Sequence, residues 1–313
     1  FVECDEDGNE KVLGAEVKIG ESWEIADMGI VDSVVSNGWL AGNTISELME
    51  TYMERIVGEN VHNFYGRQFP ILIKFLHVNE KLSVQIHPDD EIAAERYDML
   101  GKEELWYVME ASEDARLYVG FNKDVTPVEL YEKCKDGTVK ELLNCIQPKK
   151  GDCLYIQPGC IHSAEGEVVI AEIQQSSDIS YRLYDWGREF NPATARQLHL
   201  EEAIDLIDYN AFNPELYKKG PLWGESDHQH TVETLVESPQ FNVSKLNLTD
   251  PLHIYTEKFE SFIVYICLEG NATISIDGGK EELTAGELVL IPAEACEVAI
   301  EGNAQLMEVY ISK

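Results

Sequence analysis

The chain has 313 residues and a formal net charge of −34, because 58 Asp and Glu outnumber 24 Lys and Arg. This acidity argues against nucleic acid or an anionic membrane as a partner, although a small anion that meets a local cluster of cations stays compatible. No apolar run reaches the roughly 18 residues that span a bilayer. The 44% hydrophobic content is typical of a folded globular protein.

The length suits two domains, each with its own core. Seven cysteines are scattered along the chain, and none forms a CxxC pair. An odd count at such spacings indicates neither a disulfide framework nor a Cys-rich zinc site. Free thiols fit a reducing compartment, so we expect a cytoplasmic protein.

In chain order, short apolar or alternating runs predict β structure that three helical segments interrupt. The first helix is predicted over 44–56, with Thr44 as N-cap and Glu47 at the capping-box spacing. A second begins at Thr126, with Pro at its first helical position, and runs towards Cys145. A third is predicted over 193–207. The clearest strands are predicted over 69–77, 105–109, 116–121 and 168–174.

A weak internal repeat divides the chain. Residues 151–158 and 286–292 each read as a Gly turn, an apolar strand and a Pro-bearing turn, and 105–120 parallels 262–278. Two related β-barrels explain this pattern better than one long fold. We therefore predict a first barrel over 1–195 with a helical insertion at about 124–145, a helical linker over 196–222, and a second barrel over 223–313.

Two polar side chains stand in the apolar run before Pro88. Gln85 and His87 lie two residues apart, so a strand would point both towards one interior. Neutral imidazole is a common metal ligand, which makes a metal ion the favoured reason for this placement. A single histidine in an apolar strand is nevertheless more often a hydrogen-bonded core residue.

Two further residues complete a candidate metal site. Glu104 opens the next strand, and His162 follows the Pro158-Gly159 turn. Two histidines and a carboxylate leave open positions on a zinc-like ion, as catalytic sites do, and a Gln oxygen is a weak fourth ligand. The second barrel offers Cys296 or Glu297 in place of His162, so we predict that it is metal-free.

A second cluster follows the candidate site in the sequence. Glu172 lies in an apolar strand, where burial would raise its pKa towards general-base use. Arg182 and Arg188 supply positive charge that the chain otherwise lacks. The alternative is a salt-bridged surface strand, and the neighbouring metal site is what favours the functional interpretation.

These motifs together resemble type I phosphomannose isomerases in their short bacterial two-cupin form. The matching segments are LSVQIHPDD at 82–90, GKEELWY at 101–107, PGCIH at 158–162, and QQSSD at 174–178 with Tyr181-Arg182. Residues 20–25 extend the match upstream. The family usually begins with a Trp-Gly-Gly strand that would precede Phe1, so we expect the first barrel to lack an edge here. The chain also has no room for the large helical domain of eukaryotic relatives.

The resemblance implies a mainly β fold of two jelly-roll cupin barrels and the interconversion of mannose 6-phosphate and fructose 6-phosphate through a cis-enediol. It implies one Zn²⁺ per chain, with other divalent metals possible, held by Gln85, His87, Glu104 and His162. Arg182 would be the catalytic arginine, with Glu172 and Lys102 as further active-site groups and with Ser83 and Arg188 at the substrate phosphate. Three alternatives are an isomerase for another sugar phosphate, a non-enzymatic sugar-binding cupin, and an iron dioxygenase, although the last usually needs a richer His set.

Overall fold

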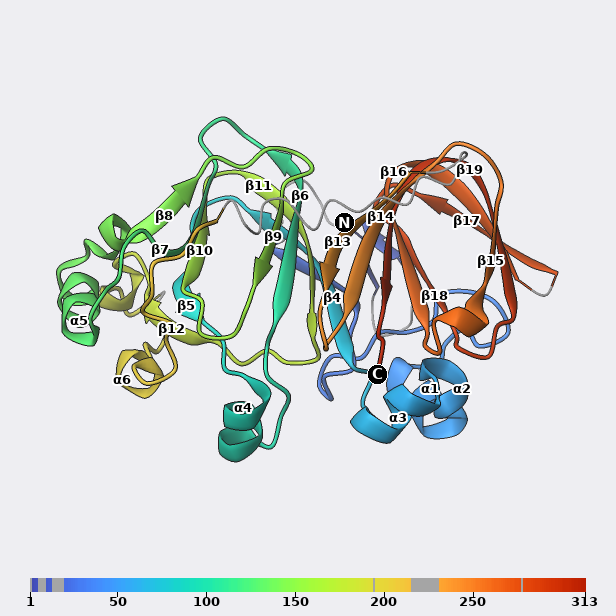
Figure 1. The fold of residues 1–313 in the computed structure, drawn as a ribbon, viewed down its shortest axis with the longest axis horizontal. Helices are drawn as coiled ribbons and strands as arrows, with labels where there is room; N and C mark the ends of the chain where they lie inside the picture. Colours follow the sequence, from blue (N-terminus) through green and yellow to red (C-terminus); the bar gives the residue numbers. More distant parts are fainter. Residues whose placement is uncertain (1, 5–9, 13–19, 194, 215–230, 277) are drawn as a thin grey trace.

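The computed structural model describes residues 2–4, 10–12, 20–193, 195–214, 231–276 and 278–313. It is mainly β, with two barrel-like units side by side and short helices around them (Figure 1). A separate hairpin pairs β1 (Val2–Cys4) with β2 (Glu10–Val12). The described part of the chain contains no helix that is both long and apolar enough to cross a membrane.

The first unit consists of two five-stranded antiparallel sheets, with strand orders β12-β5-β10-β7-β8 and β3-β4-β11-β6-β9. The strands of the first sheet are β5 (Val84–Ile86), β7 (Arg116–Phe121), β8 (Leu143–Ile146), β10 (His162–Glu165) and β12 (Tyr181–Tyr184). Those of the second are β3 (Glu21–Ile25), β4 (Ile71–Val78), β6 (Glu104–Ala111), β9 (Cys153–Ile156) and β11 (Val168–Gln175). The four strands predicted from apolar runs are all present, as β4, β6, β7 and β11.

The second unit is a seven-stranded sheet in the order β13-β14-β19-β16-β17, with β15 paired to β19 and β18 paired to β16. Its strands are β13 (Thr231–Glu237), β14 (Asn242–Leu248), β15 (Leu252–Tyr255), β16 (Ile263–Ile276), β17 (Gly279–Thr284), β18 (Leu288–Ile291) and β19 (Glu297–Tyr310). A short 3-10 turn, η3 (Thr256–Lys258), precedes β16.

Matched backbone contacts confirm the repeat. In the first unit, Val108 of β6 exchanges hydrogen bonds with Gly151 and Asp152, at 2.8 and 2.9 Å. In the second, Cys267 of β16 does the same with Gly286 and Glu287, at 2.9 Å each. This register makes β6 equivalent to the first half of β16. Trp106 therefore corresponds to Tyr265, and Glu104 corresponds to Ile263.

The predicted helices are present but shorter than expected. α1 (Ile45–Tyr52) begins with the complete capping box of Thr44 and Glu47, and it ends at Met53, whose φ of 48° interrupts the helix. α2 (Glu54–Val57) and α3 (Glu59–Tyr65) follow, and all three lie below the second barrel in Figure 1. α4 (Asp90–Tyr97) lies below the first barrel.

The other two helical predictions were too long. α5 (Pro127–Asp136) has the predicted Thr126 cap but ends at Gly137, whose φ of 77° suits a left-handed C-cap. A 3-10 turn η1 (Val139–Leu142) and strand β8 replace its expected continuation. Of the segment 193–207, only α6 (Leu200–Ala203) is α-helical among the described residues, with η2 (Arg188–Phe190) shortly before it. Much of the predicted linker, 215–230, lies outside the described residues.

A continuous apolar core joins the two barrels. It contains Ile73 of β4, Val264 of β16 and Leu48 of α1 in one cluster. The rings of Phe69 and Phe262 meet across the junction with centroids 4.7 Å apart. Contact between two aromatic rings contributes about 0.5–1.5 kcal/mol beyond the burial of their apolar area. The junction is therefore a packed interface that can fix one barrel relative to the other.

Candidate metal centre and active site

Three buried side chains of the first barrel converge. Ligand atoms of His87, Glu104 and His162 all lie within 4.8 Å of one another. The Nε2 atom of His87 is 3.4 Å from Glu104 Oε2, and that of His162 is 3.3 Å from Glu104 Oε1. All three residues are at most 1% exposed. The structure thus brings together three of the four predicted metal ligands.

The local backbone explains how the sequence positions these groups. His87 follows β5, while Glu104 and His162 each open a strand, so all three lie at strand ends. The Pro-Gly turn before His162 is bonded to His87, because Gly159 N donates to His87 O at 2.9 Å. Gly159 has a φ of 78°, and a Cβ there would lie 2.6 Å from Leu206 O. Only glycine fits this turn.

Hydrogen bonds at the far side of each ring fix the histidine tautomers. Nδ1 of His87 bonds Ile179 O, and Nδ1 of His162 bonds Cys160 O, both at 2.9 Å. A carbonyl oxygen only accepts, so each Nδ1 must carry the proton. Each neutral ring therefore presents the Nε2 lone pair to Glu104. Among the described residues neither Nε2 has a hydrogen-bond partner.

The protonation states of the two histidines favour a bound cation at this cluster. Burial lowers the pKa of His87 to about 3 and also lowers that of His162, so both rings are neutral. Two nitrogen lone pairs then face a carboxylate, which is repulsive unless a positive charge lies between them. Such imidazoles, held through Nδ1 by a carbonyl, are the usual form of zinc-binding histidines.

Lys102 places one positive charge at the edge of the cluster. Its Nζ is 3.1 Å from Glu104 Oε2, and the lysine is 5% exposed. Burial opposes the charge on both groups. Even so, the ion pair holds the pKa of Lys102 above its usual range and that of Glu104 well below it. Glu104 is therefore ionised and able to bind a metal.

Glu172 lies in the same sheet, on the same side as Glu104. It is opposite Trp106 on one neighbouring strand and Lys74 on the other. Trp106 Nε1 donates to Glu172 Oε1 at 2.8 Å, and Lys74 Nζ is 3.7 Å from Oε2. Burial raises the pKa of Glu172, although Lys102 opposes this shift. The raised pKa agrees with the sequence-based expectation.

The facing sheet carries Gln85 and Arg182 in one row with His162. Gln85 of β5 is directly opposite His162 of β10 and directly opposite Arg182 of β12. Opposed residues on neighbouring strands share a face, so this row points into the same interior. Ser83 Oγ donates to Gln85 Oε1 at 3.4 Å. Gln85 and Arg182 are half-buried, whereas His162 is fully buried, so the row leads from the surface to the cluster.

A small basic cluster lies beside Arg182. The buried carboxylate of Asp185 accepts from Arg188 Nη2 at 2.7 Å and from Arg196 Nη2 at 2.6 Å. Burial disfavours this carboxylate, yet the two arginines hold the pKa of Asp185 below its usual range. Burial, followed by repulsion from Arg196, lowers the pKa of Arg182. Arg196 is not among the predicted site residues, because its segment was predicted to be a linker helix.

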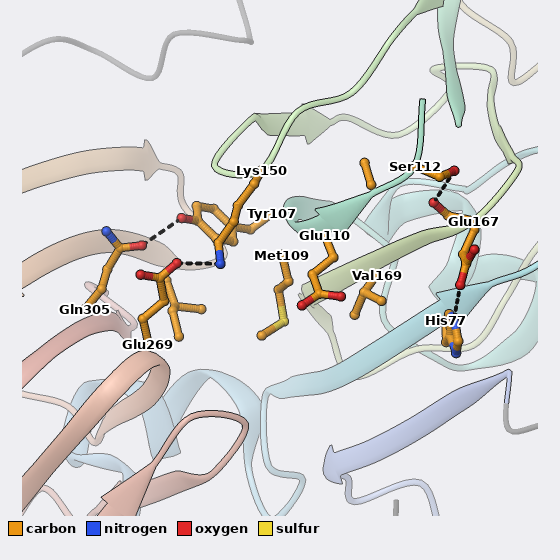
Figure 2. A pocket seen from close by; sticks show the side chains of 12 residues that line it. His77, Tyr107, Met109, Glu110, Ser112, Lys150, Glu167, Val169, Glu269 and Gln305 are labelled. Atoms are coloured by element: carbon orange, nitrogen blue, oxygen red, sulfur yellow. Dashed lines mark hydrogen bonds and ion pairs between the residues drawn. The ribbon is translucent and has the colours of Figure 1, made fainter. Parts of the chain in front are cut away.

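A cleft beside the first barrel does not coincide with these residues. It has a volume of about 560 Å³ and lies outside the first barrel, facing the second. Figure 2 shows that Lys150 and Glu269 bridge it, with a distance of 2.5 Å between Nζ and Oε1. Beside them Tyr107 OH donates to Gln305 Oε1 at 3.1 Å. None of the predicted site residues lines this cleft.

Two β-barrels with a buried His-Glu-His cluster in the first define a candidate cupin metalloprotein. The descriptions "Phosphomannose isomerase type I, catalytic domain" and "Mannose-6-phosphate isomerase, cupin domain" match residues 7–133 and 231–311. Mannose-6-phosphate isomerase ManA of Bacillus subtilis (strain 168) is 32% identical, over 92% of this chain and 88% of that protein. The chain belongs to the type I phosphomannose isomerase family, as its motifs predicted.

Other relatives agree with this assignment. A mannose-6-phosphate isomerase of Streptococcus mutans is 31% identical over 92% of this chain and 87% of that protein. The crystal structure of a mannose 6-phosphate isomerase from Bacillus subtilis superposes with a TM-score of 0.82 at 29% identity, covering 93% of this chain and 90% of that one. A phosphomannose isomerase mutant from Salmonella typhimurium shares the fold, with a TM-score of 0.75 at 16% identity and coverage of 94% and 91%. The predicted mainly β, cupin-type fold is confirmed.

Proposed function

We propose that the chain interconverts mannose 6-phosphate and fructose 6-phosphate with the aid of one divalent metal ion. The observation that carries this proposal is the convergence of two unprotonated imidazole nitrogens on the ionised Glu104. Family membership supports the reaction, and the His-Glu-His cluster supports the metal.

His87, Glu104 and His162 would hold the ion, with Gln85 as a fourth, weaker ligand. Two imidazoles and one carboxylate are a typical donor set of catalytic zinc sites, although other divalent metals accept the same donors. When bound, the ion supplies Lewis-acid stabilisation for negative charge on the C1 and C2 oxygens of the sugar, an effect worth several kcal/mol.

Glu172 is the proposed base. Its carboxylate would take the proton from C2, which leaves a cis-enediol, and would return it to C1, while a second proton passes between the two oxygens. The raised pKa of Glu172 brings it nearer the value that suits proton transfer in both directions. The hydrogen bond from Trp106 holds the carboxylate in one orientation.

Positive side chains would balance the charges of substrate and enediol. Lys102 lies beside Glu104, and Arg182 lies at the open end of the row that contains Gln85. The phosphate would meet Ser83 and Arg188, and we add Arg196 because it shares Asp185 with Arg188. Asp185 offsets one of these positive charges.

A coupled assay for fructose 6-phosphate, run with and without a chelator, tests the proposal directly. We expect turnover of mannose 6-phosphate, its loss on chelation, and its recovery when Zn²⁺ is added back. Glucose and ribose phosphates in parallel decide whether another sugar phosphate is preferred. Binding of mannose 6-phosphate without solvent deuterium entering C1 or C2 would instead indicate a sugar-binding protein without isomerase activity.

A further inference from the structure

The second barrel has no carboxylate where the first has Glu104, yet it contacts the segment that carries the metal cluster. That contact is made by Asp90, the first residue of α4, three residues after His87. We propose that Gln240 of the second barrel is a positioning residue for the metal centre and acts through Asp90. This inference rests on the proposed function, because it concerns the same metal site.

Asp90 ties together three parts of the chain. Its Oδ1 accepts from Gly101 N at 2.9 Å and from Gln175 Nε2 at 2.8 Å. Its Oδ2 accepts from Gln240 Nε2 at 2.9 Å. Gln175 in turn accepts from Glu103 N at 3.0 Å through its Oε1. Asp90 therefore reaches the segment 101–104 directly and through Gln175.

This segment has little freedom once Asp90 is fixed. Lys102 N donates to Pro88 O at 3.0 Å, which places the segment against the residue after His87. A Cβ on Gly101 would lie 2.6 Å from Asp90 N, so the two stretches are in close contact. Any displacement of Asp90 is consequently passed to Lys102 and Glu104 on one side and towards His87 on the other.

Gln240 is itself held in a single orientation. Its Oε1 accepts from Tyr65 OH of α3 at 3.1 Å and from Lys313 Nζ at 3.3 Å. Because both partners donate, the amide must present Nε2 to Asp90. Tyr65 of α3 and Lys313 thus help to fix Gln240 and, through it, the carboxylate of Asp90. The C-terminus lies at this junction in Figure 1.

Reversing the polarity of one hydrogen bond gives a specific test. Gln240→Glu places a second carboxylate against Asp90, and adding Asp90→Asn restores a donor–acceptor pair in the opposite sense. Tyr107→Phe is the matched control, because it removes a hydrogen bond of similar length between the barrels, to Gln305, away from the cluster. The readouts are the rate of Zn²⁺ release to a chelator and the hydrogen exchange of the Gly101 amide.

We expect Gln240→Glu to release Zn²⁺ about tenfold faster than wild type, at the lower end of what loss of an outer partner costs a metal site. Gly101 exchange should also rise, the double variant should return to within about twofold of wild type, and Tyr107→Phe should change neither readout. Wild-type release and exchange in Gln240→Glu, or equal changes in Tyr107→Phe, would overturn the positioning role. A wild type that binds Zn²⁺ but does not isomerise the sugar refutes only the proposed function. A chain that binds no divalent metal refutes both.

Discussion

Glu172 and Glu308 occupy the same position in the two barrels. Glu172 is opposite Trp106 and accepts its Nε1–H at 2.8 Å, while Glu308 is opposite the equivalent Tyr265 and accepts its hydroxyl at 2.6 Å. Burial raises the pKa of both carboxyl groups. The carboxylate–aromatic pair therefore belongs to the framework of both barrels. The two positions differ in their neighbours, because the first barrel has Glu104 where the second barrel has Ile263.

This pairing supplies a matched control for the proposed base. Glu172→Gln keeps the shape and the hydrogen bond from Trp106 but removes the proton acceptor. We expect exchange of the C2 proton with solvent to fall by about 10²–10⁴-fold, the usual contribution of a general base, while Zn²⁺ stays bound. Glu308→Gln should leave exchange unchanged. Deuterium incorporation followed by NMR measures both, and exchange retained in Glu172→Gln would show that another group moves the proton.

A second prediction concerns the two histidines of the proposed metal site. The double variant His87→Ala/His162→Ala should bind no stoichiometric Zn²⁺ and should lose isomerase activity, because it removes both nitrogen ligands. His253→Ala is the control, since this exposed histidine of the second barrel bonds only Glu297 among the described residues. Metal analysis after dialysis gives the stoichiometry, and circular dichroism confirms folding. Full activity in the metal-free double variant would refute metal dependence.

Much of the site could be predicted because its residues lie in short, regular segments. A strand period of two placed Gln85 towards the interior, and a Pro-Gly turn marked the position of His162. The structure confirms that His87, Glu104 and His162 converge. The assignments of Gln85, Lys102, Glu172, Arg182, Ser83 and Arg188 to specific roles stay predictions.

The predictions that failed concern elements whose ends depend on tertiary contacts. The helical pattern after Thr126 continued past Gly137, but β8 forms there because it pairs with β7. Around 193–207 the helix is reduced to α6, and Arg196 instead bonds the buried Asp185. A local sequence pattern gives no information about contacts with residues that are distant in the chain. This is also why the bonds from Asp90 to Gln175 and Gln240 could not be found in the sequence.

Arg196 gives a third prediction. Arg196→Ala removes one of the two arginines on Asp185 and should raise the KM for mannose 6-phosphate about tenfold, with a smaller effect on kcat, because it would act on binding of the phosphate. Inorganic phosphate should also inhibit this variant less. Arg55→Ala is the control, an exposed arginine paired with Glu294. A fall in kcat at unchanged KM would place Arg196 with the reacting groups instead.

Arg182→Ala should behave differently from Arg196→Ala. Arg182 shares its row with Gln85 and His162, so its charge would act on the enediol rather than on the phosphate. We expect kcat to fall by at least about 10²-fold, as for loss of a group that stabilises developing charge, with little change in the melting temperature. Steady-state kinetics and thermal unfolding measured together decide the matter. A loss of stability that matches the loss of turnover would make Arg182 a structural residue.

The buried histidines predict how the metal-free protein responds to pH. Burial lowers the pKa of His87 from 6.5 to about 3, so below pH 6.5 the unfolded chain binds a proton that the folded chain does not. Unfolding is then favoured as the pH falls, by about 1.4 kcal/mol per pH unit for this residue, and the effect is absent above pH 6.5. In chelator-treated protein, His87→Leu should remove this part of the slope, so wild type should lose stability relative to the variant between pH 6.5 and 4.5. Urea unfolding at several pH values measures the difference. Parallel pH profiles would show that His87 is protonated in the folded state, and the lone-pair geometry facing Glu104 would then be wrong.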